Sequence, residues 1–180
     1  TLSFPATIFG SGENWKLVDY IKGFNWLLYE GGKFSTSEKR GIFMDVALTI
    51  FPADYWRWWL LSNAPENSDT NFTWDSFQNT INKDLADVLG NFITRVTKFS
   101  LAKFGSKIPK CNDYGVLETK TINEIELLYE KYNNFLTKIE IRKASQELRN
   151  IWVVGKEASD AVIFKFILLL RLCEEFSLVQ

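Results

Sequence analysis

A short run of residues suited to phosphate chemistry follows a Gly-Gly pair in the first quarter of the chain. The run Lys33-Phe34-Ser35-Thr36-Ser37 is followed closely by Lys39 and Arg40. Hydroxyl groups and backbone N–H groups after a glycine turn can surround phosphate oxygens, and lysines supply the opposite charge. The spacing is not that of a Walker loop. On composition alone an ordinary solvated loop explains the run better, and a phosphate-binding arm is the alternative.

A second group of polar residues has helical spacing. Asn91 and Arg95 are four residues apart and Lys98 is three further on, so the three side chains share one face of a helix. A planar amide beside a guanidinium suits the recognition of unstacked bases in single-stranded RNA. The segment from 89 to 111 holds several basic residues and no acidic one. From spacing alone, an ordinary solvated face is the simpler interpretation.

The elements that must position these residues differ between the two parts of the chain. Aromatic, β-prone segments on both sides of Glu30-Gly31-Gly32 predict a β-hairpin. Pro52 suits the start of a helix that ends before Pro65. The residues NSDTNF, at 67–72, are interpreted as a polar connector.

From position 73 onward the pattern predicts a helical bundle. Thr73 is the expected N-cap of a helix over 74–104. Its expected core stripe comprises Leu85, Leu89, Phe92, Val96 and Phe99. Further helices are predicted over 119–136, 139–157 and 161–178, with a loop at 105–115. The acidic residues Glu124, Glu126 and Glu130 are interpreted as a solvated helix face.

A block of aromatic residues lies between the two parts. Tyr55, Trp58 and Trp59 have helical spacing and are expected to form a core between the two parts, whereas Trp56 falls outside that spacing. Base stacking is the less favoured alternative for this block.

Composition excludes several kinds of site. The chain has no histidine, which excludes a Ser-His-Asp or Cys-His nucleophile and a histidine-ligated metal within it. Cys111 and Cys173 are too far apart for a zinc pattern, and so few cysteines fit a reducing compartment. The net charge of −1 excludes a protein that coats nucleic acid by charge alone. The apolar segment IFKFILLL is short and predicts a buried helix rather than a membrane span.

Longer strings of residues resemble one family closely. FPATIFGSGENWKLVDYI, GGKFSTS, PADYWRWWLLSNAPENSDTNFTWDSFQ, NKDLADVLGNFITRVTKF and IRKASQELRNIWVVG, in this order, are similar to methionyl-tRNA synthetases. The resemblance implies a mainly α fold: the end of a class I Rossmann-type catalytic domain, with a short β-hairpin, then a stem-contact region and an α-helical anticodon-binding bundle. The implied parts are 1–72, with the loop and stem-contact region, and 73–180, the anticodon-binding domain. The chain is then expected to be a C-terminal piece of a longer protein.

The resemblance gives the loop a specific role. KFSTS stands where the family has its KMSKS loop, which closes over ATP during amino-acid activation. Lys33, Ser35 and Ser37 match the motif, while Phe34 replaces the methionine and Thr36 replaces the second lysine. That lysine stabilises charge on the leaving pyrophosphate, which threonine cannot do. We hypothesise that Lys39 or Arg40 compensates.

The resemblance also implies partners. Asn91 and Arg95 stand where the family has two contacts to the CAU anticodon, and Lys98 extends the same face. The expected reaction is ATP-dependent activation of methionine and its transfer to tRNA(Met), with ATP bound as its Mg²⁺ complex, no metal site in this chain, and no membrane or DNA partner. The expected compartment is the cytoplasm.

Two departures leave alternatives open. The family's Pro-Trp anticodon element is missing near Ala158, and Trp152 is not an obvious substitute. The catalytic half with its HIGH-type motif does not occur in these residues, so the 180-residue chain is not expected to aminoacylate alone. A non-catalytic tRNA-binding or helical interaction module derived from the family is one alternative. A class I synthetase for Leu, Ile, Val or Cys is another, which the strings SNAPENSD and DVLGNF argue against.

Overall fold

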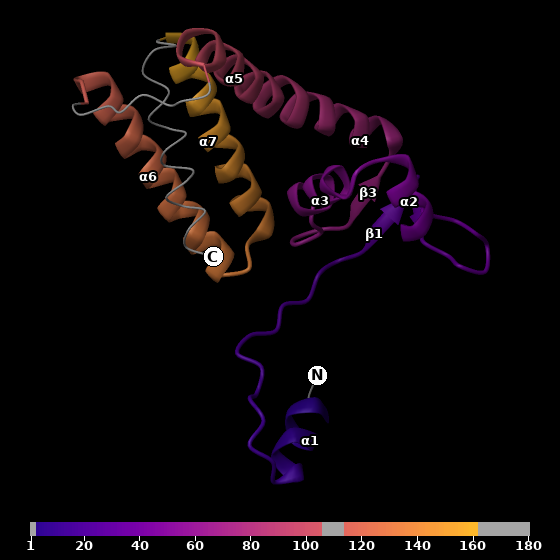
Figure 1. Cartoon of the computed structure of the whole chain (residues 1–180). Coiled ribbons are helices and arrows are strands. Elements are labelled where there is room, and N and C mark those ends of the chain that lie inside the picture. The colour runs from indigo at the N-terminus through magenta and orange to yellow at the C-terminus, as the bar shows by residue number, and fades with distance from the viewer. Residues whose placement is uncertain (1–2, 106–113, 162–180) are drawn as a thin grey trace.

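The computed structural model describes residues 3–105 and 114–161 and is mainly helical, as the sequence predicts (Figure 1). Its α-helices are α1 (Ser3–Ser11), α2 (Met44–Ile50), α3 (Ala53–Ser62), α4 (Trp74–Thr80), α5 (Asn91–Phe104), α6 (Val116–Thr137) and α7 (Ile141–Ala161). A π-helix, η1 (Ile81–Gly90), connects α4 to α5. The helix predicted over 161–178 lies outside the described residues except for its first position.

A small sheet organises the first part. Strands β1 (Leu27–Tyr29) and β2 (Gly32–Lys33) form the predicted antiparallel hairpin. Its turn needs positive φ at both central residues, and the structure has φ of 45° at Glu30 and 78° at Gly31. The interpretation of 67–72 as a polar connector is wrong in its second half, because β3 (Thr70–Phe72) pairs in parallel with β1. Phe72 explains the strand: its side chain is buried and stacks on Tyr29.

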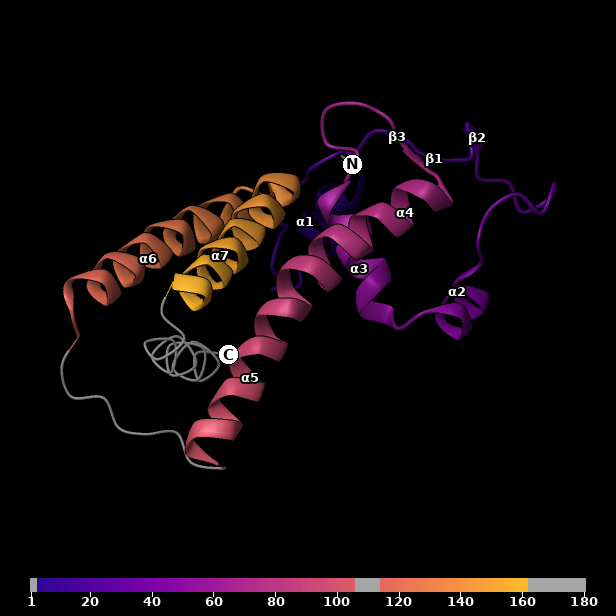
Figure 2. The same cartoon turned by 90° about the horizontal axis from the view of Figure 1, so that it is seen from above.

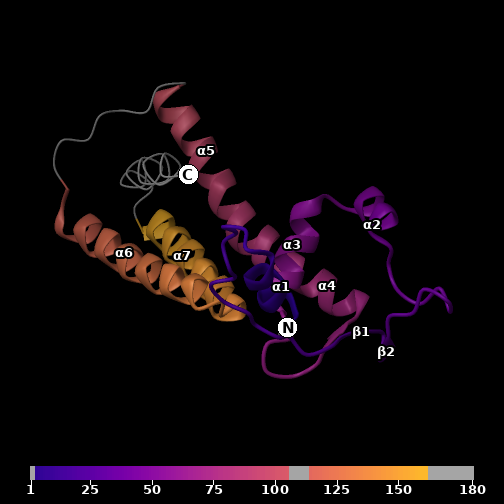
Figure 3. The same cartoon turned by 90° about the horizontal axis from the view of Figure 1, so that it is seen from below.

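The helices that follow the sheet along the chain form two groups (Figures 1 and 2). α6 and α7 form an antiparallel pair, and α7 contacts α3, η1 and α5. α4, η1 and α5 form one continuous helical rod that crosses α7. The loop between β2 and α2 projects to the side opposite α6 in all three views (Figures 1 to 3). α1 buries no residue and is joined to β1 by an extended segment.

An aromatic core joins α3, the sheet and α4. Trp58 and Trp59 are buried as predicted, whereas Tyr55 is only half-buried. Trp56, which the predicted spacing left out, is buried: it packs on Phe77 with ring centroids 4.5 Å apart, and its indole N–H donates to the Ala47 carbonyl. Trp56 and Trp58 are both buried because α3 is packed on two sides, by the sheet with α4 and by α7. These rings form a core, and the arrangement does not favour base stacking.

The long helix predicted over 74–104 is continuous but not α-helical throughout. Thr73 is its N-cap, as expected, because its hydroxyl accepts from the Ser76 N–H at 3.1 Å. The middle ten residues are π-helical, which rotates the buried face relative to a regular α-helix. The predicted core stripe is therefore partly wrong. Of its members only Val96 is buried, and the other four are half-buried. The buried residues of η1 are Ile81, Asp84 and Val88.

Candidate functional site

The loop after β2 forms a tight turn. Ser35 and Arg40 exchange two backbone hydrogen bonds, of 3.0 and 2.8 Å, which close the turn at its base. Inside it, the Ser35 hydroxyl lies 3.1 Å from the Ser37 hydroxyl and accepts from the Glu38 N–H at 3.3 Å. Thr36 and Lys39 are exposed at the tip, where Lys39 has a φ of 52°. The structure thus brings the two motif serines together.

Two cations of this region lie against the hairpin. The Lys33 ammonium lies 5.5 Å from the centroid of the Trp26 ring, a cation–π contact. The Arg40 guanidinium lies against Gly32, in the space that a Cβ there would fill. Phe34 is held by Tyr29, with ring centroids 5.6 Å apart, and lies against Gly41. Arg40 therefore folds back toward the strand that carries Lys33.

The second predicted group lies on α5. Asn91, Arg95 and Lys98 are all exposed, and they follow one another at helical spacing from the first residue of the helix. Helical geometry places three side chains with this spacing along one face. The structure brings these residues together on α5 and does not bring them near the loop after β2, which projects from the sheet.

The π-helix changes the backbone just before Asn91. The Asn91 backbone N–H donates to the carbonyls of Ala86 and Val88. In a regular α-helix it would donate to the Asp87 carbonyl instead. The Asp87 carbonyl instead accepts from the Asn91 side-chain amide and from the Lys156 ammonium, both at 3.2 Å. π-turns inside α-helices occur frequently at functional sites.

A buried carboxylate connects η1, α7 and α3. Asp84 of η1 accepts from the Arg149 guanidinium at 2.6 Å and from the Trp58 indole N–H at 3.2 Å. Sequence reasoning missed Asp84, although an acidic residue between Ile81 and Val88 in an apolar stripe is a signal of a buried, paired charge.

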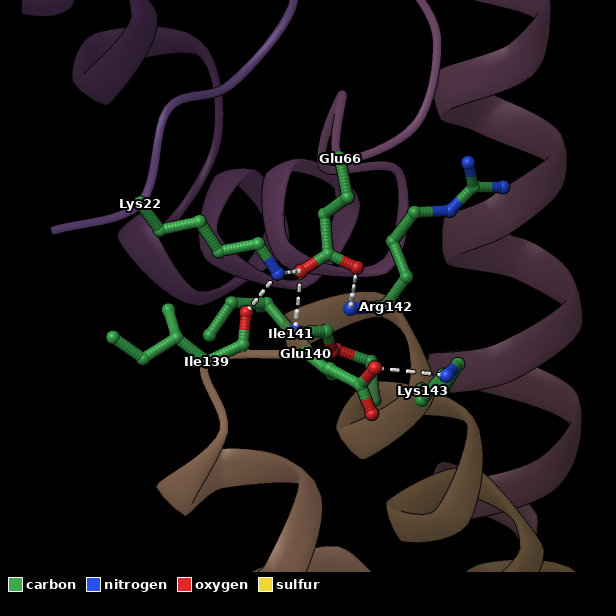
Figure 4. A network of polar contacts seen from close by, with 8 residues as sticks. Lys22, Glu66, Ile139, Glu140, Ile141, Arg142 and Lys143 are labelled. Atoms are coloured by element: carbon green, nitrogen blue, oxygen red, sulfur yellow. Dashed lines mark hydrogen bonds and ion pairs between the residues drawn. The ribbon is translucent and has the colours of Figure 1, made fainter. Parts of the chain in front are cut away.

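A second carboxylate that sequence reasoning missed connects distant segments (Figure 4). Glu66 accepts from the Lys22 ammonium at 2.9 Å and from the backbone N–H groups of Ile141 and Arg142 at 2.7 and 3.2 Å. The Lys22 ammonium also donates to the Ile139 carbonyl. Glu66 thus caps the N-terminus of α7 and holds it to the segment that leads into β1. No local pattern predicts this contact.

The Glu66 environment favours the charged form. Burial raises the pKa of the Glu66 carboxyl, but the hydrogen bonds from Lys22, Ile141 and Arg142 and the charge of Lys22 outweigh it, so the net pKa is lowered from 4.5. The side chain of Glu66 is only 6% exposed and that of Lys22 21%. The ion pair is therefore a largely buried structural contact.

Neither a metal site nor a membrane span is found in residues 3–105 and 114–161. No group of three or more acidic, Cys or His side chains there is arranged to hold a metal ion. No helix in that part of the chain is long and apolar enough to cross a bilayer.

Two family models match the chain. The family model described as class I tRNA synthetases (M) matches residues 1–97, which is more than half of the sequence. The chain belongs to the class I methionyl-tRNA synthetase family. The model described as the anticodon binding domain of methionyl tRNA ligase matches residues 108–162.

Methionyl-tRNA synthetases of several bacteria are close relatives. The chain is 61% identical over 157 residues to the methionine–tRNA ligase of Paracoccus denitrificans, covering 87% of this chain and 27% of the relative. It is 62% identical over 157 residues to the ligase of Jannaschia sp., covering 87% of this chain and 28% of that relative. The chain thus spans about a quarter of the length of these ligases.

Proposed function

We propose that this chain is the C-terminal part of a methionine–tRNA ligase, which activates methionine with Mg²⁺-ATP and transfers it to tRNA(Met) in the cytoplasm. Residues 1–72 would hold the ATP-binding loop and the stem-contact region, and 73–180 the anticodon-binding domain. The observation that carries the proposal is the roughly 60% identity to methionine–tRNA ligases across both parts together with the exposure of Asn91 and Arg95 on α5.

The loop after β2 would act on the triphosphate of ATP. The Lys33 ammonium and the hydroxyls of Ser35 and Ser37 supply donors for phosphate oxygens, and the tip carries further N–H groups. Charge develops on the leaving pyrophosphate during activation, and cationic donors placed there stabilise the transition state. Thr36 supplies no charge. Arg40 is a better candidate than Lys39 to supply the charge that Thr36 lacks. Its guanidinium lies against Gly32, directly before Lys33.

The α5 face would read the anticodon. The Asn91 amide keeps its carbonyl oxygen for a base edge while its N–H holds the Asp87 carbonyl. Arg95, one turn further on, offers a planar guanidinium for stacking or hydrogen bonding to an unstacked base, and Lys98 adds charge along the same face.

Anticodon recognition is tested by binding. The dissociation constants of this chain for tRNA(Met) and for the same tRNA with one anticodon base changed are compared. Asn91→Ala and Arg95→Ala should each weaken binding of tRNA(Met) by about 1–3 kcal/mol and reduce the preference for CAU. The matched control is Lys131→Ala on the exposed surface of α6. Equal affinity of the unchanged chain for all anticodons would contradict the assignment.

Catalysis is tested in a hybrid ligase, in which this chain replaces the corresponding segment of the Paracoccus denitrificans enzyme. The hybrid should catalyse methionine-dependent pyrophosphate exchange, and the isolated chain should not. The second candidate, a non-catalytic tRNA-binding module, is favoured by Thr36 in the motif. A hybrid that binds tRNA(Met) but does not exchange pyrophosphate, and that Thr36→Lys restores, would support this second candidate.

A further inference from the structure

The π-helix before Asn91 leaves one backbone acceptor for side chains of two different helices. The Asp87 carbonyl accepts from Asn91 of α5 and from Lys156 of α7, each at 3.2 Å. The amide nitrogen and the ammonium nitrogen are therefore at most twice this distance apart. A cation from α7 thus lies next to the amide that heads the α5 face.

Packing fixes the position of this cation. Gly155 is buried against the Phe92 ring, and a Cβ at Gly155 would lie 2.7 Å from the nearest ring atom. The absence of a side chain lets α7 approach α5 at this point. Lys156, the next residue, is half-buried, so its stem is held between the helices while its hydrogen bond lies at the surface.

The ammonium of Lys156 retains capacity for a ligand. An ammonium group has three N–H donors, and one of them is used by the Asp87 carbonyl. Among the side chains that the structure describes, which leave out that of Asp160, no carboxylate forms an ion pair with Lys156. A cation that is held by a backbone carbonyl, and not neutralised by a carboxylate, is suited to an anionic ligand.

We propose that Lys156 is a further RNA-binding residue, which contacts the phosphate next to the nucleotide bound at Asn91. This rests on the proposed function of the α5 face and extends the RNA surface onto α7. The contact carries no base specificity, because a phosphate is the same in every nucleotide. It fixes the strand relative to Asn91, which reads the base.

The experiment measures binding of RNA hairpins with the anticodon arm of tRNA(Met), carrying CAU or a changed anticodon, to the 180-residue chain over a range of salt concentrations. Lys156→Met should weaken binding of both hairpins by the same factor, roughly fivefold at 0.1 M salt, and reduce the slope of log K against log salt by about one. Lys156→Arg keeps the charge and should retain the slope. Lys120→Met, on the exposed surface of α6, is the matched control.

The outcomes separate this proposal from the function on which it rests. An unchanged affinity and salt slope in Lys156→Met, in a chain that prefers CAU, would overturn the proposal and leave the proposed function intact. A loss of affinity for the CAU hairpin alone would also overturn it, because the residue would then read a base. Equal binding of all hairpins by the unchanged chain would contradict anticodon recognition, while a reduced slope in Lys156→Met would still support the phosphate contact.

Discussion

The Lys22 ammonium donates to the Glu66 carboxylate at 2.9 Å, although 44 residues separate them in the sequence. Glu66 at the same time caps the first residues of α7 through the N–H groups of Ile141 and Arg142. One carboxylate therefore holds together the segment before β1, the connection after α3 and the turn between α6 and α7. This contact holds the start of α7 against the segments that precede β1 and follow α3.

Removing the charge of Glu66 should destabilise the protein. In Glu66→Gln the Lys22 ammonium loses its ionic partner, and the N-terminus of α7 is capped by a weaker, neutral acceptor. The free energy of unfolding should fall by about 2 kcal/mol, measured by denaturant titration. The control is Asp19→Asn, since Asp19 pairs with Lys16 at side chains that are 78% and 81% exposed. An equal loss in both variants would contradict a special role of Glu66.

The lowered pKa of Glu66 predicts a specific pH dependence. Because the pKa in the folded state is below 4.5, this group contributes stability that is fully present above 4.5 and is lost as the pH falls through the folded-state value. Unfolding midpoints measured between neutral and acid pH should therefore decrease for the unchanged protein. In Glu66→Gln the part of this decrease that comes from protonation of Glu66 should be missing. Parallel curves for the two proteins would show that other carboxyl groups cause the loss.

Replacing the buried Asp84 alone should lower the free energy of unfolding strongly. Replacing it together with its cation, Arg149, should lower it much less. Asp84→Leu leaves Arg149 without its carboxylate and the Trp58 N–H without an acceptor, and should lower the free energy of unfolding by about 3 kcal/mol. The double variant with Arg149→Met replaces the ion pair with apolar groups and should recover much of this loss. A double variant less stable than Asp84→Leu alone would contradict the ion-pair interpretation.

A methyl group at Gly90 should destabilise the π-helix. Alanine in an ordinary α-helix is more favourable than glycine by up to about 1 kcal/mol. At Gly90, however, the added Cβ would lie 2.9 Å from the Leu85 carbonyl oxygen, so Gly90→Ala should lower the thermal midpoint. The matched control is Gly10→Ala in α1, where nothing lies within 4 Å of the added Cβ. A higher midpoint for Gly90→Ala would indicate that the helix returns to regular α geometry.

The compensation for Thr36 can be tested by a double-mutant cycle in the hybrid ligase. Arg40→Ala should reduce the rate of pyrophosphate exchange roughly tenfold or more, because a charge-assisted contact in the transition state is lost. Thr36→Lys should raise the rate and should make Arg40→Ala nearly neutral, since both cations would serve the same phosphate. Lys16→Ala is the control on the exposed N-terminal segment. Equal effects of Arg40→Ala with and without Thr36→Lys would show that Arg40 does not compensate.

The elements whose signals are local can be predicted from the residues alone. The Glu30-Gly31 turn, the Thr73 cap and the helix after Pro52 depend on a few neighbouring residues, because backbone conformation and capping are decided within one or two turns. The exposed placement of Asn91, Arg95 and Lys98 likewise follows from helical spacing beside an apolar stripe.

Contacts between distant segments could not be predicted and depend on how the whole chain folds. β3 forms because Phe72 is buried beside Trp56 and Trp59. No pattern within residues 67–72 predicts that burial. Asp84 is buried because Arg149 and Trp58 arrive from two other helices. Glu66 and Lys22 meet, and Lys156 reaches the Asp87 carbonyl, for the same reason. A buried charge or an unusual helical turn is stable only with partners from distant segments, and folding alone brings those segments together.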